Sequence, residues 1–463
     1  MNVFDLPLLG RLFRWRWGRL VFQLLLLALA VLVIYEGFTG PDLASTNLST
    51  VLVWIHYRGF IILALLILGN LFCFACPFTL PRTVAVRLSR AGGRWPRALR
   101  NKWLSIAGLL IIFWLYEWLD LWANPPLTAW LVVAYFIAAF ALEFLFAESP
   151  FCKYVCPLGA FNFIYSTGSP LQITAHSLKV CQECEGKECV NGSEEVLGCG
   201  TELFAPTLRS NMDCTLCLDC VRACPYDNVL LVARRPLTEW LSSVLRRRWD
   251  YTFLVVSLTF FAVTNAFGMV PPMFALQKWL QQTLHIQSGA IRILITFSTL
   301  NLVIPAIAIL ACTQSSARLT SRVRPVPGRD IAARYAPAFI PLGFGVWFAH
   351  YGFHFAVGGL ALIPVLQTFL LDNGLTWLGK TPNWTLSYLL PPDWIFPLQV
   401  FSVTVGFIIA MVVLAVSGVR SLQEPIEALK ELLPWALFLM MLTIAALLVF
   451  NLPMEMRTTR MMT

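Results

Sequence analysis

Four cysteines near the middle of the chain follow the spacing by which bacterial ferredoxins hold iron–sulfur clusters. Cys214, Cys217, Cys220 and Cys224 precede Pro225 and form the pattern C-x2-C-x2-C-x3-C-P. In this pattern three thiolates bind one [4Fe–4S] cubane, and the fourth binds a second cluster. A zinc site is the alternative, but zinc usually takes its four ligands as two separated pairs. The run therefore predicts a ferredoxin-type cluster site.

A second, stretched set of cysteines lies upstream, as a segment with two clusters needs. Its members are Cys181, Cys184, Cys189 and Cys199, with Gly200 where the proline would stand. The last cysteine of each run is expected to bind the cluster of the other run. Cluster 1 is therefore assigned Cys181, Cys184, Cys189 and Cys224. Cluster 2 is assigned Cys214, Cys217, Cys220 and Cys199. Cys199 has the least regular spacing of the eight.

Four further cysteines stand where two apolar segments end. They are Cys73 and Cys76, followed by Pro77, and Cys152 and Cys156, followed by Pro157. Spacings of three and four residues place each pair on one face of a helix, and proline stops that helix sharply. Three interpretations stay open: a further metal or cluster site, a redox-active thiol pair, and a structural role beneath the insert. Cys312 is isolated and is expected to be a small apolar residue.

The composition predicts a polytopic, all-α membrane protein around these cysteines. Of 463 residues, 58% are hydrophobic and 13% are charged, about half the charged fraction of a soluble domain. We expect nine spans, at 18–37, 51–72, 103–122, 128–147, 251–270, 290–312, 335–356, 395–417 and 433–452. Region 335–372 leaves two alternatives, one span with an interfacial or re-entrant helix, or a hairpin of two spans. We expect an N-terminal membrane domain (1–164), a ferredoxin-like domain with two [4Fe–4S] clusters (165–240) and a C-terminal membrane domain (241–463).

The charge pattern predicts the orientation in a bacterial inner membrane. With the N-terminus in the cytoplasm, 28 of the 34 Lys and Arg side chains fall in cytoplasmic segments, as the positive-inside rule requires. This places the insert in the cytoplasm, where thiols stay reduced. The first apolar run has no cleavage site after it and is expected to be an uncleaved anchor. The net charge of +9 is explained by these loops, so no nucleic-acid partner is expected.

Several polar side chains fall inside predicted spans, where ionisable groups are costly and often functional. Those at similar depth in the outer half are His56, Arg58, Glu117, His350 and His354. They are candidates for a quinol site, which needs an apolar slot, hydrogen-bonding partners and a proton acceptor. Two histidines on facing helices are also candidates for axial ligands of haem b. A hydrogen-bonded cluster without a cofactor is the third interpretation.

Membrane helices that end in Cys-Pro motifs, followed by a two-cluster ferredoxin segment, resemble the NapH and NosR group of membrane polyferredoxins. The cytochrome oxidase accessory protein CcoG is similar in its core. The resemblance covers about residues 50–230. The group has C-x3-C-P twice, whereas this chain has it at Cys152 and Cys156 and C-x2-C-P at Cys73 and Cys76. The resemblance implies that electrons enter from a quinol, or, for a CcoG-like protein, that copper is reduced or a respiratory complex assembled.

The cysteine motifs and the polar clusters together predict an electron-transfer subunit. It would link the membrane quinone pool to other redox protein subunits, as a quinol dehydrogenase subunit within a hetero-oligomeric complex in the lipid bilayer. Two [4Fe–4S] clusters are the expected cofactors, with quinone as a further ligand and haem b or an additional metal as alternatives. A transporter or sensor is the third class considered, but the last five spans show no strong repeat of broken helices.

Overall fold

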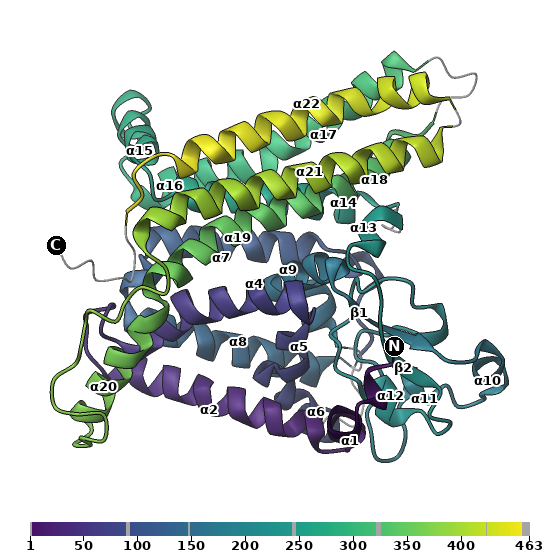
Figure 1. The fold of residues 1–463 in the computed structure, drawn as a ribbon, viewed down its shortest axis with the longest axis horizontal. Coiled ribbons are helices and arrows are strands. Elements are labelled where there is room, and N and C mark those ends of the chain that lie inside the picture. The colour runs from purple at the N-terminus through teal and green to yellow at the C-terminus, as the bar shows by residue number, and fades with distance from the viewer. Residues whose placement is uncertain are drawn as a thin grey trace. The chain divides into compact units, whose positions relative to one another are not determined.

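The computed structural model describes residues 2–88, 93–146, 149–242, 247–320, 326–422 and 424–455. These residues form two compact units, each built from three segments of the chain. Unit 1 comprises residues up to 32, 63–108 and 131–239. Unit 2 comprises 33–62, 109–130 and the residues from 240 onward. Both units are mostly helical (Figure 1).

Unit 1 holds all the cysteines except Cys312. Its own elements are α1 (Pro7–Arg14), α5 (Leu71–Ala75), α6 (Leu80–Leu88), α9 (Pro157–Tyr165), β1 (Leu171–Ala175), α10 (Leu178–Glu183), α11 (Glu188–Asn191), α12 (Asp219–Ala223) and β2 (Val229–Ala233). Five helices contribute residues to both units. They are α2 (Gly18–Thr39), α4 (Arg58–Ile67), α7 (Trp103–Trp118), α8 (Pro125–Leu145) and α13 (Thr238–Ser242).

Unit 2 contains the C-terminal half of the chain. Its own helices are α3 (Leu48–Val51), α14 (Trp249–Phe267), α15 (Pro271–Thr283), α16 (Gly289–Ser298), α17 (Ile304–Leu319), α18 (Gly328–Tyr335), α19 (Phe339–Gly358), α20 (Leu362–Asp372), α21 (Ile395–Ser421) and α22 (Pro425–Phe450). Helix α21 packs against both α19 and α22. Gly345 and Gly406 allow α19 and α21 to approach each other closely. A β-carbon added to either glycine would lie only 3.3 Å from the α-carbon of the other.

Eight helical segments of the described residues are long and apolar enough to cross a membrane. They are Gly18–Thr39, Leu48–Ile67, Pro125–Leu145, Trp249–Phe267, Gly289–Leu319, Gly328–Asp372, Pro392–Ser421 and Pro425–Phe450. Each overlaps one of the nine predicted spans. The remaining prediction, 103–122, corresponds to the shorter apolar helix α7 of 16 residues. The predicted span 128–147 ends at Leu145, and residue 147 lies outside the described residues.

The ambiguous region 335–372 contains one long helix and one short one. Helix α19 ends at Gly358, a single turn covers Gly359–Ala361, and α20 follows with 11 residues. At about 1.5 Å per residue α20 is about 16 Å long, too short for a hydrocarbon core of about 30 Å. Of the two alternatives, one span with an additional short helix is therefore the better description.

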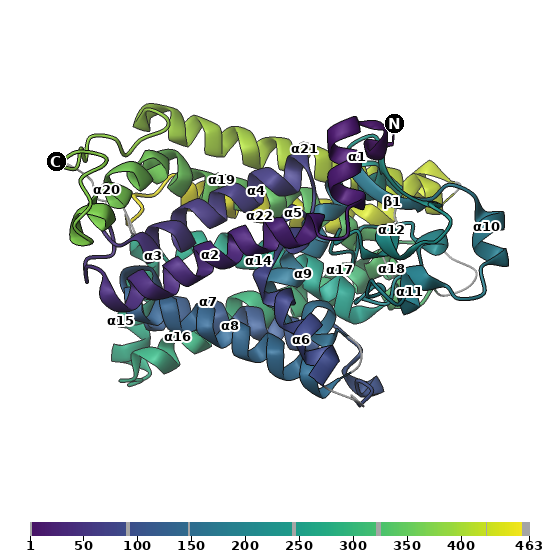
Figure 2. The ribbon, with the colours of Figure 1, turned by 90° about the horizontal axis from the view of Figure 1, so that it is seen from below.

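The cysteine-rich insert of unit 1 folds around a two-stranded antiparallel sheet. Strand β1 pairs with β2 in the register Leu171 to Ala233 and Ala175 to Val229. The three short helices α10, α11 and α12 lie between these strands in the sequence. The N-terminal segment adds a backbone bridge from Asn2 to Val232, and α1 lies beside this sheet in both views (Figures 1 and 2).

The insert shares its hydrophobic core with other parts of unit 1. Phe4 from the N-terminus and Phe74 from α5 are buried against Ile173, Leu218 and Leu231 of the insert. The ring of Phe74 also makes edge contacts with Phe13 and Phe22. Because these apolar side chains come from three chain segments, the insert is an integral layer of unit 1.

A buried ion pair joins the insert to the start of α7. Lys102 Nζ lies 2.5 Å from Asp213 Oδ1, and the two side chains are 1% and 0% exposed. The same ammonium donates a hydrogen bond to the main-chain carbonyl of Lys153 and lies over the ring of Phe163. Asp213 directly precedes Cys214, and Lys153 lies between Cys152 and Cys156. The Lys102 side chain therefore contacts both the loop before Cys214 and the loop between Cys152 and Cys156.

We expect Lys102→Met to lower the free energy of unfolding by about 3–5 kcal/mol, because it leaves the Asp213 carboxylate buried without its cation. The double variant Lys102→Met/Asp213→Asn removes both charges and should recover most of that loss. The measurement is a denaturant titration of the purified protein in detergent, followed by tryptophan fluorescence. A single variant as stable as the wild type would show that the pair has no such role.

Candidate functional site

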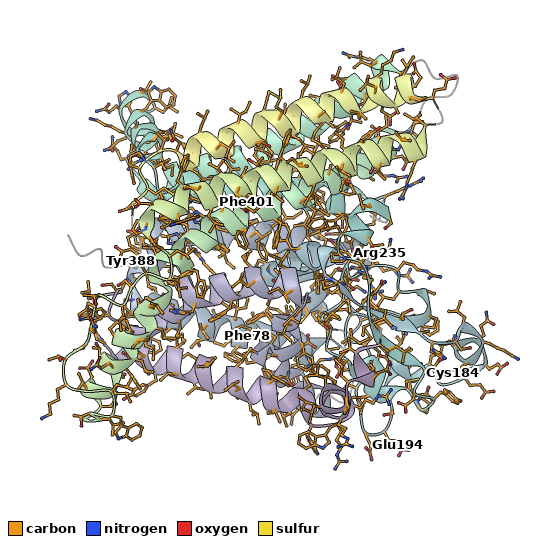
Figure 3. The ribbon with its side chains drawn as sticks, in the orientation of Figure 1. Phe78, Cys184, Glu194, Arg235, Tyr388 and Phe401 are labelled. Atoms are coloured by element: carbon orange, nitrogen blue, oxygen red, sulfur yellow. The ribbon has the colours of Figure 1, made fainter. Side chains whose placement is uncertain are left out.

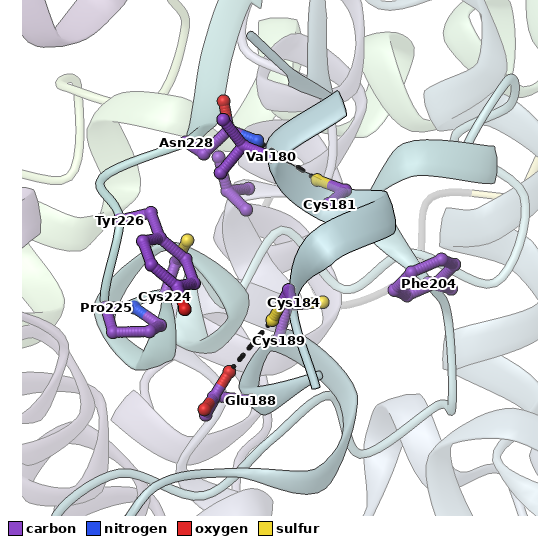
Figure 4. Close-up of a pocket in the computed structure, with 11 residues that line it drawn as sticks. Val180, Cys181, Cys184, Glu188, Cys189, Phe204, Cys224, Pro225, Tyr226 and Asn228 are labelled. Atoms are coloured by element: carbon purple, nitrogen blue, oxygen red, sulfur yellow. Dashed lines mark hydrogen bonds between the residues drawn. The ribbon is translucent and has the colours of Figure 1, made fainter. Parts of the chain in front are cut away.

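The four cysteines assigned to cluster 1 line one cavity of the insert. Cys181, Cys184, Cys189 and Cys224 surround a small cavity of about 20 Å³. Figure 4 shows their side chains directed toward this space, with Pro225 and Tyr226 beside Cys224. Asn228 Nδ2 donates to Cys181 Sγ at 3.0 Å, and Cys184 Sγ donates to Glu188 Oε2 at 3.2 Å.

The four cysteines assigned to cluster 2 line a second cavity. Cys199, Cys214, Cys217 and Cys220 surround a small cavity of about 20 Å³, with apolar neighbours such as Leu203 and Leu208. Cys199 Sγ accepts a hydrogen bond from the Leu203 main-chain N–H. The cavities thus divide the eight cysteines as the sequence assignment does, including the exchange of Cys199 and Cys224.

The thiols of each set influence one another electrostatically. Burial raises the pKa of Cys214, and charge on Cys199 or Cys217 raises it further. Burial likewise raises the pKa of Cys189, and the three other thiols of its set add to the effect. Four thiolates therefore cannot share such a cavity without a compensating cation. A bound metal cluster would supply that positive charge and draw the thiols into their ionised form.

Strained backbone surrounds the second cavity. Asp213, Leu216 and Leu218 have φ angles of 66°, 51° and 61°. A leucine in this left-handed region is unfavourable by about 1–3 kcal/mol unless the surrounding structure compensates. These residues alternate with Cys214 and Cys217, so the strain directs the sulfur atoms of the run into the cavity.

The sulfur spacing does not suit a single metal ion. Among the described residues, no group of three or more His, Cys, Asp or Glu side chains is arranged to hold one. A tetrahedral zinc with bonds of about 2.3 Å would draw its sulfur ligands to within about 4 Å of each other. A single zinc ion would therefore require the thiols around each cavity to move closer together.

The Cys-Pro motifs lie at junctions between two helical segments. Cys73 lies in α5 and Cys152 in a single π-helical turn, Phe151–Val155. Cys76 and Cys156 have extended backbone, with ψ angles of 120° and 115°. The prediction that each pair shares one helix face is therefore wrong, because the chain leaves the helix before the second cysteine. Proline begins the next helical segment, as its fixed φ favours at a first helical position, and Cys156 Sγ caps α9 through Gly159 N–H.

The two Cys-Pro pairs nevertheless lie close together within unit 1. Burial raises the pKa of Cys156 to about 12, and charge on Cys73 raises it further. Burial also raises the pKa of Cys152, with Glu143, Cys156, Cys76 and Cys73 as neighbouring negative charges. Asn162 Nδ2 donates to Cys73 Sγ at 3.4 Å. The structure therefore brings all four thiols into one buried group, in which proton loss is unfavourable without a bound cation.

The polar side chains predicted inside the membrane lie in unit 2. His56 belongs to a π-helical turn, Leu52–Tyr57, a feature often found at functional sites. Its two ring nitrogens lie 3.0 Å from the Val51 carbonyl and 2.9 Å from the Gly359 carbonyl. Because both nitrogens face main-chain carbonyls, His56 is poorly placed to bind a haem iron.

Arg58 is enclosed by aromatic rings. Its guanidinium carbon lies 4.6 Å from the ring centres of Trp54 and Tyr116 and 4.9 Å from that of Tyr351. Arg58 Nη1 also donates to the Tyr116 hydroxyl at 3.2 Å. His350 lies next to Tyr351 and packs against His354, with ring centres 5.0 Å apart. These contacts are those of a densely packed interior, which favours the structural interpretation of the cluster.

Glu117 lies in different surroundings from the two histidines of α19. It lines a cavity of about 340 Å³ together with Asp120, Gly268, Gln277 and Glu455. Gly268 lies against the Glu117 carboxylate, since a β-carbon at this position would lie 2.6 Å from Glu117 Oε1. The five predicted residues are thus divided between the packed aromatic cluster and this cavity.

Sequence reasoning missed the charged residues that support the cysteine loops. Besides Lys102 and Asp213, these include Arg19, whose Nη1 lies 2.9 Å from Asp219 Oδ2 between Cys217 and Cys220. Gly200 lies against the end of the Arg82 side chain. A β-carbon at that position would lie 2.2 Å from Arg82 Nη1, so a larger residue there would have to displace the guanidinium. The only sequence signal was that Asp213, Asp219 and Gly200 adjoin cysteines, and Lys102 and Arg19 had none.

Comparison of the chain with protein-family models, with curated proteins and with solved structures gives no match. The class that the fold defines is a mostly helical protein with eight candidate membrane-spanning helices among its described residues. Its function therefore has to be argued from the arrangement of its own side chains.

We expect Cys199→Ala to lower the iron content from about eight to about four atoms per chain, because it removes one ligand of the second cavity. Iron is measured colorimetrically on anaerobically purified protein. Cys312→Ala is the matched control, because Cys312 lies in unit 2 beside the Pro434 carbonyl. A variant that keeps about eight iron atoms would remove Cys199 from the ligand set.

Proposed function

We propose that the protein is a membrane-bound iron–sulfur electron-transfer subunit that oxidises quinol and passes the electrons to a partner redox protein. The observation that carries this proposal is the division of eight cysteines between two cavities, four thiols to each. The ferredoxin spacing of Cys214, Cys217, Cys220 and Cys224 supports [4Fe–4S] clusters as their occupants. We place the insert on the cytoplasmic side of a bacterial inner membrane, because Lys and Arg are concentrated in the loops on that side.

Two [4Fe–4S] clusters would supply one-electron carriers when bound. The protein itself would bind the clusters and adjust their reduction potentials. The first cavity offers Cys181, Cys184, Cys189 and Cys224, and the second offers Cys199, Cys214, Cys217 and Cys220. Asn228 donates to Cys181 Sγ and Leu203 N–H to Cys199 Sγ, and such hydrogen bonds to ligand sulfurs raise the reduction potential.

Two ion pairs lie near the second cavity. Arg19 pairs with Asp219, which lies between Cys217 and Cys220, and Lys102 pairs with Asp213, which directly precedes Cys214. Both pairs are internal to unit 1 and largely excluded from solvent. Because both ion pairs are shielded from solvent, their charges keep fixed positions. Their electric field at the thiolates therefore changes little when an electron arrives.

We expect a reduced quinol to produce paramagnetic cluster signals in the anaerobically purified protein, because quinol would be its electron source. Duroquinol and menadiol are the probes, and the signals are recorded by electron paramagnetic resonance at low temperature. Sodium dithionite serves as the positive control for intact clusters. The proposal fails if dithionite reduces the clusters but neither quinol does, and if the matching quinones do not reoxidise them.

A second candidate function, reduction of copper, is favoured by the convergence of the four Cys-Pro thiols. Soft thiolates select Cu(I). Two thiols that form a disulfide release two protons and two electrons, which reduce two Cu(II) ions to Cu(I). The buried group formed by Cys73, Cys76, Cys152 and Cys156 supplies candidate thiols for this step. Respiratory-complex assembly would be the biological setting of such an activity.

If copper is the substrate, the double variant Cys152→Ser/Cys156→Ser should lose Cu(I) formation and keep about eight iron atoms per chain. Cu(I) is measured anaerobically with bathocuproine disulfonate after addition of Cu(II), and Cys312→Ser is the matched control. A wild-type yield of Cu(I) from the double variant would eliminate this candidate, because the thiols would then take no part.

A further inference from the structure

Unit 1 contains a large open cavity that none of the predicted sites explains. Its volume is about 890 Å³. Helices α2, α6 and α8 form its walls, and the insert loop 194–201 closes one end. Figure 3 shows Phe78, one of its lining residues, among these helices, and Glu194, another, in the insert. The cavity therefore connects apolar membrane helices with the cysteine-rich layer.

The walls of this cavity are apolar along the helices. Leu20 and Leu27 of α2, Val84 of α6, and Phe136 and Phe140 of α8 contribute side chains to it. Val84 is 53% exposed and Phe140 is 38% exposed in helices that carry an apolar surface. A hydrophobic ligand could thus enter from the bilayer, and the cavity volume lies within the 300–1,000 Å³ typical of small-molecule sites.

Buried polar groups converge at the end of the cavity near the cysteines. Glu143 is 4% exposed, and its Oε2 accepts a hydrogen bond from Ser149 Oγ at 2.9 Å. Arg82 Nε forms an ion pair with the same oxygen at 3.7 Å, too far for a hydrogen bond, and has no hydrogen-bond acceptor among the described residues. Gln23, 6% exposed, donates to Thr79 Oγ1. A carboxylate acceptor and a guanidinium donor therefore lie together at this end of the cavity.

Two cysteine groups border the same cavity. Cys152 of the Cys-Pro group and Cys217 of the second cluster set are both lining residues. Glu143 is close enough to Cys152 for its charge to act on that thiol. Any redox-active ligand held by Arg82 and Glu143 would consequently lie beside the thiols that the proposed electron path uses.

We propose that this cavity is the quinol-oxidation site, with Arg82 and Glu143 holding the head group and the apolar wall of α2 and α8 holding the isoprenoid tail. The inference rests on the proposed electron-transfer function. Arg82 Nε–H would donate to one ring oxygen, and the Glu143 carboxylate would accept from the hydroxyl of the quinol. Glu143 is buried and Arg82 is half-buried in an ion pair with it, so their positions are largely fixed before the ligand binds.

The reaction at this site balances with the acceptors already named. Quinol loses two protons and two electrons and becomes quinone. One O–H bond breaks toward the Glu143 carboxylate, which passes its proton to water at the open end, and the second proton follows. Glu195 marks that end, since its side chain lines the cavity and is 71% exposed. The two electrons go singly to iron–sulfur acceptors, the class that the eight cysteines would hold.

A phospholipid is a less suitable occupant. Arg16, Arg19 and Arg82 could attract an anionic head group, but Glu143 and Asp219 line the same cavity. Buried carboxylates repel a phosphate, whereas a neutral quinol needs one as its proton acceptor. The packed cluster around Arg58 is the rival location, and it offers Arg58 enclosed by three aromatic rings.

The inference is tested by photolabelling the full-length protein with an azidoquinone and mapping the labelled peptides. Label is expected in residues 16–27, 78–84 and 136–143, and excess duroquinol should suppress it. Glu143→Gln should slow cluster reduction by duroquinol about a hundredfold, while reduction by dithionite stays unchanged. Leu27→Trp narrows the cavity without altering a polar group and should also reduce labelling. Glu427→Gln, whose carboxylate pairs with Lys430 in α22, is the matched control.

The possible outcomes separate the site from the function. Labelling of the cavity without cluster reduction by quinol supports the site and overturns the proposed function. Cluster reduction at the wild-type rate in both Glu143→Gln and Leu27→Trp overturns the inference and leaves the function standing. Label confined to the peptides around His56 and His350 also overturns it, as does a cavity that retains phospholipid and takes no label.

Discussion

The buried ion pair between Lys102 and Asp213 is the contact on which the arrangement of the cysteines depends. A lone ammonium or carboxylate in this position would cost several kcal/mol, so each is stable only with the other in place. The Lys102 ammonium also donates to the Lys153 carbonyl. A single cation therefore fixes the loop before Cys214 and the loop between Cys152 and Cys156. The insert and the Cys-Pro segments form one layer because they share this partner.

The rest of unit 1 follows from the need to hold thiols together that repel one another when ionised. Burial and mutual charge raise the pKa of thiols in all three cysteine groups. Local sequence cannot supply this convergence, since leucines in left-handed conformations are unfavourable on their own. The compensation comes from tertiary packing, in which Phe4 and Phe74 join the core of the insert. The burial of apolar side chains thus stabilises loops that have strained backbone conformations and closely spaced thiols.

Much of this organisation could be predicted from the sequence, and the physical reason is periodicity. Apolar runs of fixed length predicted nine helices, and eight are long enough to span a membrane. Cysteine spacing predicted two sets of four, and each set lines a separate cavity. Contacts between segments far apart in the chain produce no such pattern. No spacing or periodicity in the sequence indicates that Lys102 pairs with Asp213 or that Arg82 lies against Gly200.

The two polar clusters show why a charged residue in an apolar segment is an incomplete guide to function. Arg58 and His56 drew attention because of their depth, yet aromatic rings enclose the arginine and main-chain carbonyls face both nitrogens of the histidine. Such contacts with other parts of the protein compensate for the free-energy cost of burying these polar side chains. Glu143 is also buried and Arg82 is half-buried beside it, but the guanidinium Nε has no hydrogen-bond acceptor among the described residues, and both residues line an open cavity. A donor that lacks an acceptor is costly to bury, and this makes the pair a more informative indicator of a site than depth in the membrane.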